Sequence, residues 1–181
     1  MSATTSRGYP YPTLSDDVDI PGDMSSLAAA VDTDVQAIVD SSKSVYVEQT
    51  TGENNQTSIT YITGANVCGL TFVAPPSGAV KLWLTGRFQN DTSGRTTGMS
   101  LQVAAGATIG SGSVISAAAD ASALECGPGA SDRIQATHYR RLTGLSPGST
   151  YNVVVMYRVI NGAGTCQIYN RKIEVEPYLS I

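Results

Sequence analysis

The feature that most constrains the fold is a series of strand-like segments with short turns between them, beginning near residue 44. The clearest of them is Val80–Gln89, in which apolar and more polar side chains alternate. Val80, Leu82, Leu84 and Phe88 point one way, and Lys81, Trp83, Thr85 and Arg87 point the other. Such alternation is typical of a strand with one buried face. Thr150–Ile160 is apolar on both faces, which predicts a central strand that is covered on both sides.

The other expected strands are Ser44–Gln49, Ser58–Thr63, Val67–Val73, Gly98–Ala104, Arg133–Leu142 and Cys166–Val175, with Val114-Ile115 as a shorter candidate. Thr50–Thr57 is expected to be a polar loop, and Ala105–Ser131 fits either close packing or a long loop. About eight strands with short turns predict a mainly β protein whose head, residues 44–181, is an antiparallel β-sandwich. The pattern does not distinguish a jelly-roll from an immunoglobulin-like topology.

A single convincing helix signal occupies residues 23–43, after the Pro21-Gly22 pair, which is unfavourable inside a helix. Its apolar residues are spaced four, three, four and three apart: Met24, Ala28, Val31, Val35 and Ile38. This spacing is that of a coiled-coil seam, and a lone helix of this length is only marginally stable in water. We therefore predict that the helix joins three copies of the chain. The alternative is an amphipathic helix lying on its own domain.

Residues 1–22 are expected to form an extended arm, because each proline disfavours helix at the residue before it. The arm carries aromatic, proline and aliphatic residues that could lie in a groove of another protein: Tyr9, Pro10, Tyr11, Pro12, Leu14, Val18 and Ile20. We predict that these residues anchor the chain to another protein. A disordered tail is the alternative.

Composition and charge exclude several classes of partner. Charged residues make up 14% of the chain and the net charge is −4, and no basic run is available to neutralise phosphates. Nucleic acid is therefore not an expected partner. No run of 18 apolar residues predicts a membrane span, and the N-terminus lacks the apolar core of a secretory signal, so folding in a cytoplasm is expected.

The sequence predicts no catalytic, cofactor or metal site. The one histidine, His138, lies in strand-like sequence without a recognisable nucleophile motif, and the carboxylates lie mostly in turn-like segments. Cys68, Cys126 and Cys166 lack the spacing of a zinc site. Two of them could form a disulfide after release from the cell, but free thiols are the expectation for a chain that folds in a cytoplasm.

Trp83 departs from the pattern of its strand, because it lies on the face that also carries Lys81 and Arg87. A tryptophan there could fill a subunit interface, pack between strands or stack on a sugar. We predict an oligomer interface, and Val154 and Met156 on the second apolar face of Thr150–Ile160 favour the same interpretation.

Residues 6–32 resemble the start of small structural proteins of tailed phages of actinobacteria. The resemblance is carried by Ser6-Arg7-Gly8-Tyr9-Pro10-Tyr11-Pro12 and by Val18-Asp19-Ile20-Pro21-Gly22-Asp23, which leads into the helix. Turns such as Ala74-Pro75-Pro76-Ser77-Gly78 are similar to those of their β-domains. The resemblance implies a minor tail protein or fibre, many of which are homotrimers with an N-terminal anchor and a β-rich tip.

Together these expectations describe a non-enzymatic virion protein, folded in the host cytoplasm before assembly. It would be a trimeric fibre or minor tail protein that is anchored by its N-terminus and presents its head outward, with a host glycan or protein as the candidate partner. A capsid decoration protein or head fibre that stabilises the particle, and a carbohydrate-binding module, are the alternatives.

Overall fold

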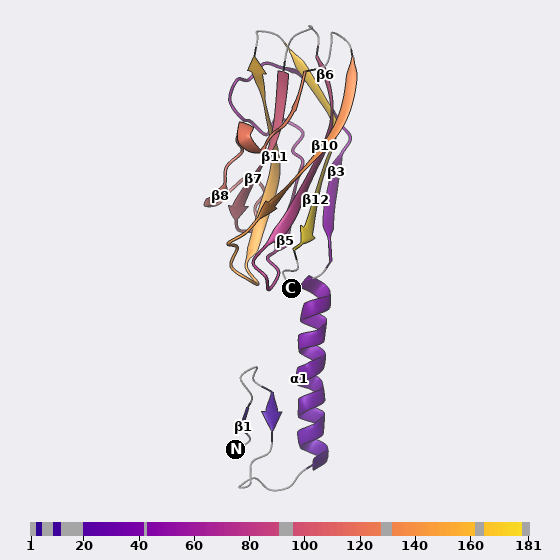
Figure 1. Cartoon of the computed structure of the whole chain (residues 1–181), viewed down its shortest axis with the longest axis vertical. Coiled ribbons are helices and arrows are strands. Elements are labelled where there is room, and N and C mark those ends of the chain that lie inside the picture. The colour runs from indigo at the N-terminus through magenta and orange to yellow at the C-terminus, as the bar shows by residue number, and fades with distance from the viewer. Residues whose placement is uncertain are drawn as a thin grey trace. The chain divides into compact units, whose positions relative to one another are not determined.

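The computed structural model describes residues 3–4, 9–11, 20–41, 43–90, 96–127, 132–161 and 165–178. The chain divides into two compact units, Met1–Ser42 and Lys43–Ile181, each of which is considered by itself (Figure 1).

The first unit consists of a long helix and two short strands. Strands β1 (Ala3–Thr4) and β2 (Pro10–Tyr11) pair antiparallel, and the helix α1 runs from Ile20 to Ser41. The helix therefore begins three residues before the predicted start at residue 23. Pro21 is compatible with this because a proline in the first turn lacks an N–H that would have no partner there in any case.

The second unit contains two antiparallel sheets. One has the order β10-β6-β12-β3, with β4 also paired to β12, and the other has the order β5-β11-β7-β8, with β9 also paired to β7. Their bounds are β3 Val45–Gln49, β4 Glu53–Gln56, β5 Gly69–Val73, β6 Val80–Asn90, β7 Thr96–Ala105, β8 Val114–Ser116, β9 Leu124–Cys126, β10 Arg133–Leu142, β11 Thr150–Asn161 and β12 Cys166–Pro177. A short 3-10 helix, η1, spans Asp120–Ser122.

The order of the strands identifies the sandwich as a jelly roll. The chain changes sheet between β5 and β6, between β6 and β7, and at each step from β9 to β12, and the last strand lies between β3 and β6. In an immunoglobulin domain the first two strands are neighbours in one sheet, whereas here β3 is paired to β12 and β5 lies in the other sheet. The predicted β-sandwich is confirmed, and its topology is the jelly-roll alternative.

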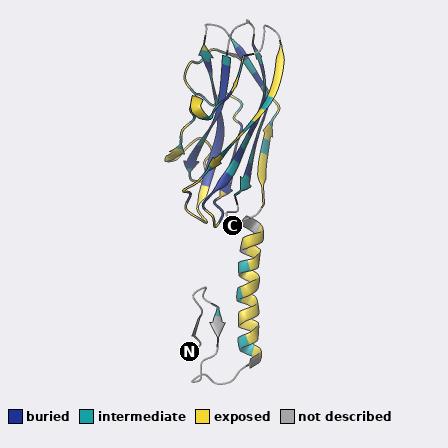
Figure 2. Cartoon of the chain, viewed as in Figure 1, coloured by how far each residue is buried: buried dark blue, intermediate teal, exposed yellow. Residues whose placement is uncertain are grey.

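The core lies between the two sheets, where the buried segments of Figure 2 face each other. On β6, the side chains of Val80, Leu82, Leu84 and Phe88 are buried, as the alternation predicted. The predicted central strand is also confirmed, because β11 lies between β5 and β7 and most of its residues are buried.

Two predictions about the segment 50–63 are wrong. The expected loop Thr50–Thr57 contains β4, and the expected strand Ser58–Thr63 contributes only an isolated bridge between Ile62 and Tyr157. The sequence of β4, Glu-Asn-Asn-Gln, contains no apolar residue, so no apolar alternation could indicate the strand. Among its described side chains, the buried one belongs to Glu53. Strand β9 was also not predicted.

The segment that follows β7, for which the sequence allowed either close packing or a long loop, covers the outer face of the β5-β11-β7-β8 sheet. We call its described part, residues 105–127, the covering segment. The buried side chain of Asn152 holds it there: its Nδ2 donates to the carbonyl oxygens of Gly106 and Ser111 at 3.1 and 3.0 Å, and its Oδ1 accepts from the Gly110 N–H at 3.0 Å. Val154 is consequently 0% exposed. It offers no surface to a partner, so the argument for an interface at Val154 fails.

All three cysteines are free thiols, with Cys68 and Cys166 buried. Burial raises the pKa of Cys68 to about 11 and also raises the pKa of Cys126. Because the thiolate is the reactive form, a raised pKa makes both thiols poor nucleophiles near neutral pH.

Candidate functional site

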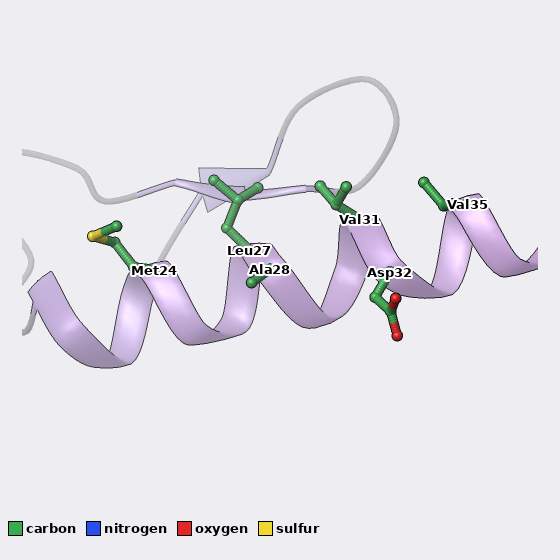
Figure 3. Close-up of a pocket in the computed structure, with 6 residues that line it drawn as sticks. All are labelled: Met24, Leu27, Ala28, Val31, Asp32 and Val35. Atoms are coloured by element: carbon green, nitrogen blue, oxygen red, sulfur yellow. The ribbon is translucent and has the colours of Figure 1, made fainter.

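The helix α1 exposes the predicted seam to solvent along its whole length (Figures 2 and 3). The exposed fractions are 67% for Met24, 51% for Val35 and 58% for Ile38, and Ala28 and Val31 are also exposed. With Leu27 and Asp32, four of these residues line a shallow groove of about 470 Å³. The structure thus places all five predicted seam residues on one open, mainly apolar face.

The arm contacts the side of α1 next to this face. The hydroxyl of Tyr9 donates to Oδ2 of Asp34 at 2.6 Å, and Ala30 and Asp34 are partly buried there. On a helix with 3.6 residues per turn, positions 30 and 34 lie about a quarter turn from the line of seam residues. The described part of the arm therefore leaves the seam open.

The predicted anchor residues belong to different elements of the first unit. Tyr9 contacts the helix, Pro10 and Tyr11 form β2, and Ile20 begins α1. The remaining three, Pro12, Leu14 and Val18, lie outside the described residues. Pairing of β1 with β2 shows that the arm has some structure within its own unit, which the sequence did not predict.

Trp83 lies on the outer face of the β10-β6-β12-β3 sheet and is half-buried. Its ring is 4.9 Å from that of Tyr139, at an interplanar angle of 33°, and its Nε1 donates to Oε2 of Glu176 at 3.2 Å. Tyr139 is 56% exposed. Of the three interpretations of Trp83, packing between strands is shown by its contacts with Tyr139 on β10 and Glu176 on β12, and its position on the outer face leaves ring surface open to a partner or a ligand.

A second polar cluster ties the covering segment to β11. The guanidinium of Arg158 makes two hydrogen bonds with the Asp120 carboxylate and a third with the carbonyl oxygen of Ile59, and Tyr61 donates to the same carboxylate at 2.9 Å. Burial, and then Asp120, raises the pKa of Tyr61 to about 12. Because all these groups satisfy one another, we interpret the cluster as a clamp rather than as a binding site.

The clamp predicts an acid-dependent loss of stability. The hydrogen bonds from Arg158, and then from Tyr61, lower the pKa of Asp120, so its contribution is present above the ordinary Asp value of about 3.9 and is lost as the pH falls through the lowered value. Between about pH 5 and pH 2, the thermal midpoint of the Asp120→Asn variant should fall less than that of the natural chain. Asp132→Asn is the control, and an equal fall in Asp120→Asn and the natural chain would contradict the prediction.

In the described parts of the chain, three or more His, Cys, Asp or Glu side chains nowhere gather in a way that could hold a metal ion. Among the same residues, no helix is long and apolar enough to cross a membrane. His138 lies partly buried on β10, opposite Leu84.

Comparisons with known proteins concern the fold. No family model and no curated protein matches the sequence. A chain from the structure of the infectious bursal disease virus Gx strain is similar with a TM-score of 0.50 and 10% identity, over 75% of this chain and 32% of that chain. The VP2 subviral particle of the same virus gives a TM-score of 0.47 with 7% identity, over 75% and 33% of the two chains.

A family 35 carbohydrate-binding module from Clostridium thermocellum gives a TM-score of 0.33 with 13% identity, over 72% of this chain and 97% of that module. Of the two viral chains named above, this chain spans about a third of the length. At 10% identity, the likeness to the Gx strain chain shows the fold alone, which is the jelly-roll β-sandwich described above.

Proposed function

We propose that this protein is a non-enzymatic structural component of a virion, a trimeric fibre or minor tail protein whose copies join through α1. The single observation that carries the proposal is the open apolar face of α1, with Met24, Val35 and Ile38 each more than half exposed. Burying such a face stabilises the assembly by roughly 25 cal/mol for each Å² of apolar surface that is removed from water. A helix that left it exposed would lose the main source of its stability.

The seam favours other copies of the same helix as the partner. Its residues follow the two-position repeat over 15 positions, and a groove in an unrelated protein would not require that repeat. Both positions carry β-branched residues: Val35 at one, and Val31 and Ile38 at the other. Seams that are β-branched at both positions tend to form three or more strands rather than two.

The head has a layout suited to outward presentation. The chain enters the sandwich at Val45, which pairs with Val175 near the end of β12. At the opposite end, Gln89 pairs with Arg133 and Asn90 with Cys166. We propose that two polar segments, Asn90–Thr97 and Ala118–Ser131, present binding residues there, since their described parts Thr97 and Cys126 pair at that far end. Residues 91–95 and 128–131 are outside the described part of the chain.

A virion location and an anchoring role for the arm complete the proposal. The jelly-roll likeness to a chain of the infectious bursal disease virus supports a virion component, and the resemblance of residues 6–32 to phage structural proteins supports a tail or fibre. In this proposal, the arm binds another virion protein and folding precedes assembly in the host cytoplasm.

The proposal predicts the mass of the protein in solution. Light scattering of the full-length chain should give three times the chain mass of 18.8 kDa, because β-branched residues at both seam positions favour three strands over two. A mass of one chain across the micromolar range would contradict the proposal.

A further inference from the structure

The outer face of the β10-β6-β12-β3 sheet carries a row of side chains that the strand register places side by side. Tyr139 pairs with Trp83, Trp83 pairs with Glu174, and Glu174 pairs with Tyr46. The row crosses all four strands, a distance of roughly 14 Å at the usual strand spacing. Tyr46 and Tyr139, at its two ends, are 69% and 56% exposed.

Trp83 is held in place within this row. Its ring packs against Tyr139, and its indole N–H is already bonded to Glu176. The polar atom of the ring thus needs no further partner, and what remains available is apolar ring surface in a fixed position. A fixed aromatic surface binds a flat ligand with little loss of side-chain entropy.

Hydrogen-bonding groups flank the aromatic row on both sides. One flanking row pairs Arg141 with Lys81 and Lys81 with Glu176, and the Lys81 ammonium lies 3.5 Å from the Glu176 carboxylate. The other flanking row is Thr137, Thr85, Lys172 and Glu48. Two hydroxyls of that row, those of Thr85 and Thr137, are 2.9 Å apart.

The charges of these three rows cancel. The rows contain three cations and three carboxylates: Lys81, Arg141, Lys172, Glu48, Glu174 and Glu176. Arg87 and Arg133 lie farther along the same face, in the next two rows. A phosphorylated or strongly acidic ligand that occupied the three rows would find no net positive charge within them. A second protein copy would have to bury these charges, whereas charged residues are depleted in the buried centre of protein interfaces.

A flat, uncharged molecule with apolar faces and polar edges matches this surface, and sugars have that chemistry. A pyranose ring presents C–H groups on its faces and hydroxyls around its rim, which fit an aromatic surface between two hydrogen-bonding rows. We propose that this face binds a neutral oligosaccharide across the strands, with Trp83 and Tyr139 stacking on its rings. The inference rests on the proposed function in taking the head as the outward part of a virion protein.

Trp83 allows a direct test because it is the one tryptophan of the chain, so emission excited selectively from tryptophan, and not from the nine tyrosines, reports on this face. The full-length protein is titrated with maltotriose, cellotriose, mannotriose and β-1,4-galactotriose, and with trigalacturonate as an acidic comparison. We expect a saturable change with at least one neutral trisaccharide and a weaker response to trigalacturonate. No response to any neutral trisaccharide, or tighter binding of trigalacturonate, would overturn the inference.

Variants locate the binding site by calorimetry with the trisaccharide that binds. Tyr139→Ala should raise the Kd roughly tenfold or more, and Tyr139→Phe, which keeps the ring, should bind within about threefold of the natural chain. Val73→Ala, at a 61% exposed position on the opposite sheet, should leave the Kd unchanged. Unchanged binding by Tyr139→Ala would overturn the inference.

Light scattering on the same samples separates this inference from the proposed function. A single-chain mass together with sugar binding refutes the trimeric fibre but supports the saccharide site. If Tyr139→Ala lowers the oligomeric mass and no trisaccharide binds, the face is an interface between copies and the inference is wrong.

Discussion

Replacing Glu53 with glutamine is expected to lower the free energy of unfolding of the protein by about 3 kcal/mol, because it leaves the charge of Arg171 buried without a counter-ion. Arg171 is 0% exposed and Glu53 is 3% exposed, and their charged groups lie 3.6 Å apart. Arg171 Nη2 donates to the Thr51 carbonyl oxygen at 2.8 Å, whereas its Nε and Nη1 have no hydrogen-bond partner among the described residues. The carboxylate of Glu53 therefore balances the buried charge of Arg171.

The surroundings of this pair leave little room for relaxation. Glu53 also accepts a hydrogen bond from the N–H of Asn66, and a Cβ at Gly64, whose φ is +73°, would collide with the Tyr157 hydroxyl. Desolvation, reinforced by the charge of Glu53, raises the pKa of Tyr157 well above its ordinary value. Arg171, Glu53 and Tyr157 are all buried, so the charge of Arg171 would stay shielded from solvent in the variant.

Urea denaturation followed by Trp83 fluorescence measures the effect. The double variant Glu53→Leu, Arg171→Met removes both charges and should lose less stability than Glu53→Gln, since a buried pair can be replaced by apolar residues at small cost. A Glu53→Gln variant within about 0.5 kcal/mol of the natural chain would show that the pair is not needed.

The second large effect is expected on α1. If the proposed trimer forms, the double variant Val31→Asp, Val35→Asp should convert it into a monomer, because each chain would bring two extra carboxylates into an apolar seam. The head should remain folded, since its core lies within the second unit. Light scattering measures the mass, and near-ultraviolet circular dichroism checks the fold of the head.

A matched control uses the same substitutions off the seam. Ala29 and Gln36 are exposed and lie on other faces of α1, so Ala29→Asp with Gln36→Asp adds the same charge to the same helix. This control should keep the mass of the natural chain. Equal masses for the seam variant and the natural chain would show that α1 does not hold the copies together.

Local patterns predicted those parts of the fold that depend on near neighbours in the sequence. The alternation in Val80–Gln89 placed the two faces of β6 correctly, and the spacing of apolar residues in α1 identified residues that the structure places on one exposed face. Strand β4 was missed because its role is non-local: Glu53 is buried only because Arg171, far along the chain, lies beside it. A hydrophobicity pattern contains no signal for such a pair.

The topology and the aromatic row also depend on long-range register. Jelly-roll and immunoglobulin-like sandwiches have similar strand patterns, and they differ in which strands pair across the chain. Trp83 was singled out from sequence, but its neighbours Tyr139, Glu174 and Tyr46 come from three other strands. They could be identified as a group only once the register was known.

The bulge in β12 has a consequence for the evolution of this surface. Between Tyr169 and Lys172 the register shifts, and Asn170 adopts a positive φ of 47°. Before the shift Cys166 and Ile168 are buried, and after it the buried positions are the odd ones, including Arg171 and Ile173. One extra residue thus changes the inward-facing positions of the strand from even-numbered to odd-numbered residues. If Asn170 instead took a place in the regular alternation, Glu174 would turn toward the core and Arg171 toward solvent, and both the outer row and the buried ion pair would be lost. Deletion of Asn170 would keep both faces, because it removes the extra residue itself.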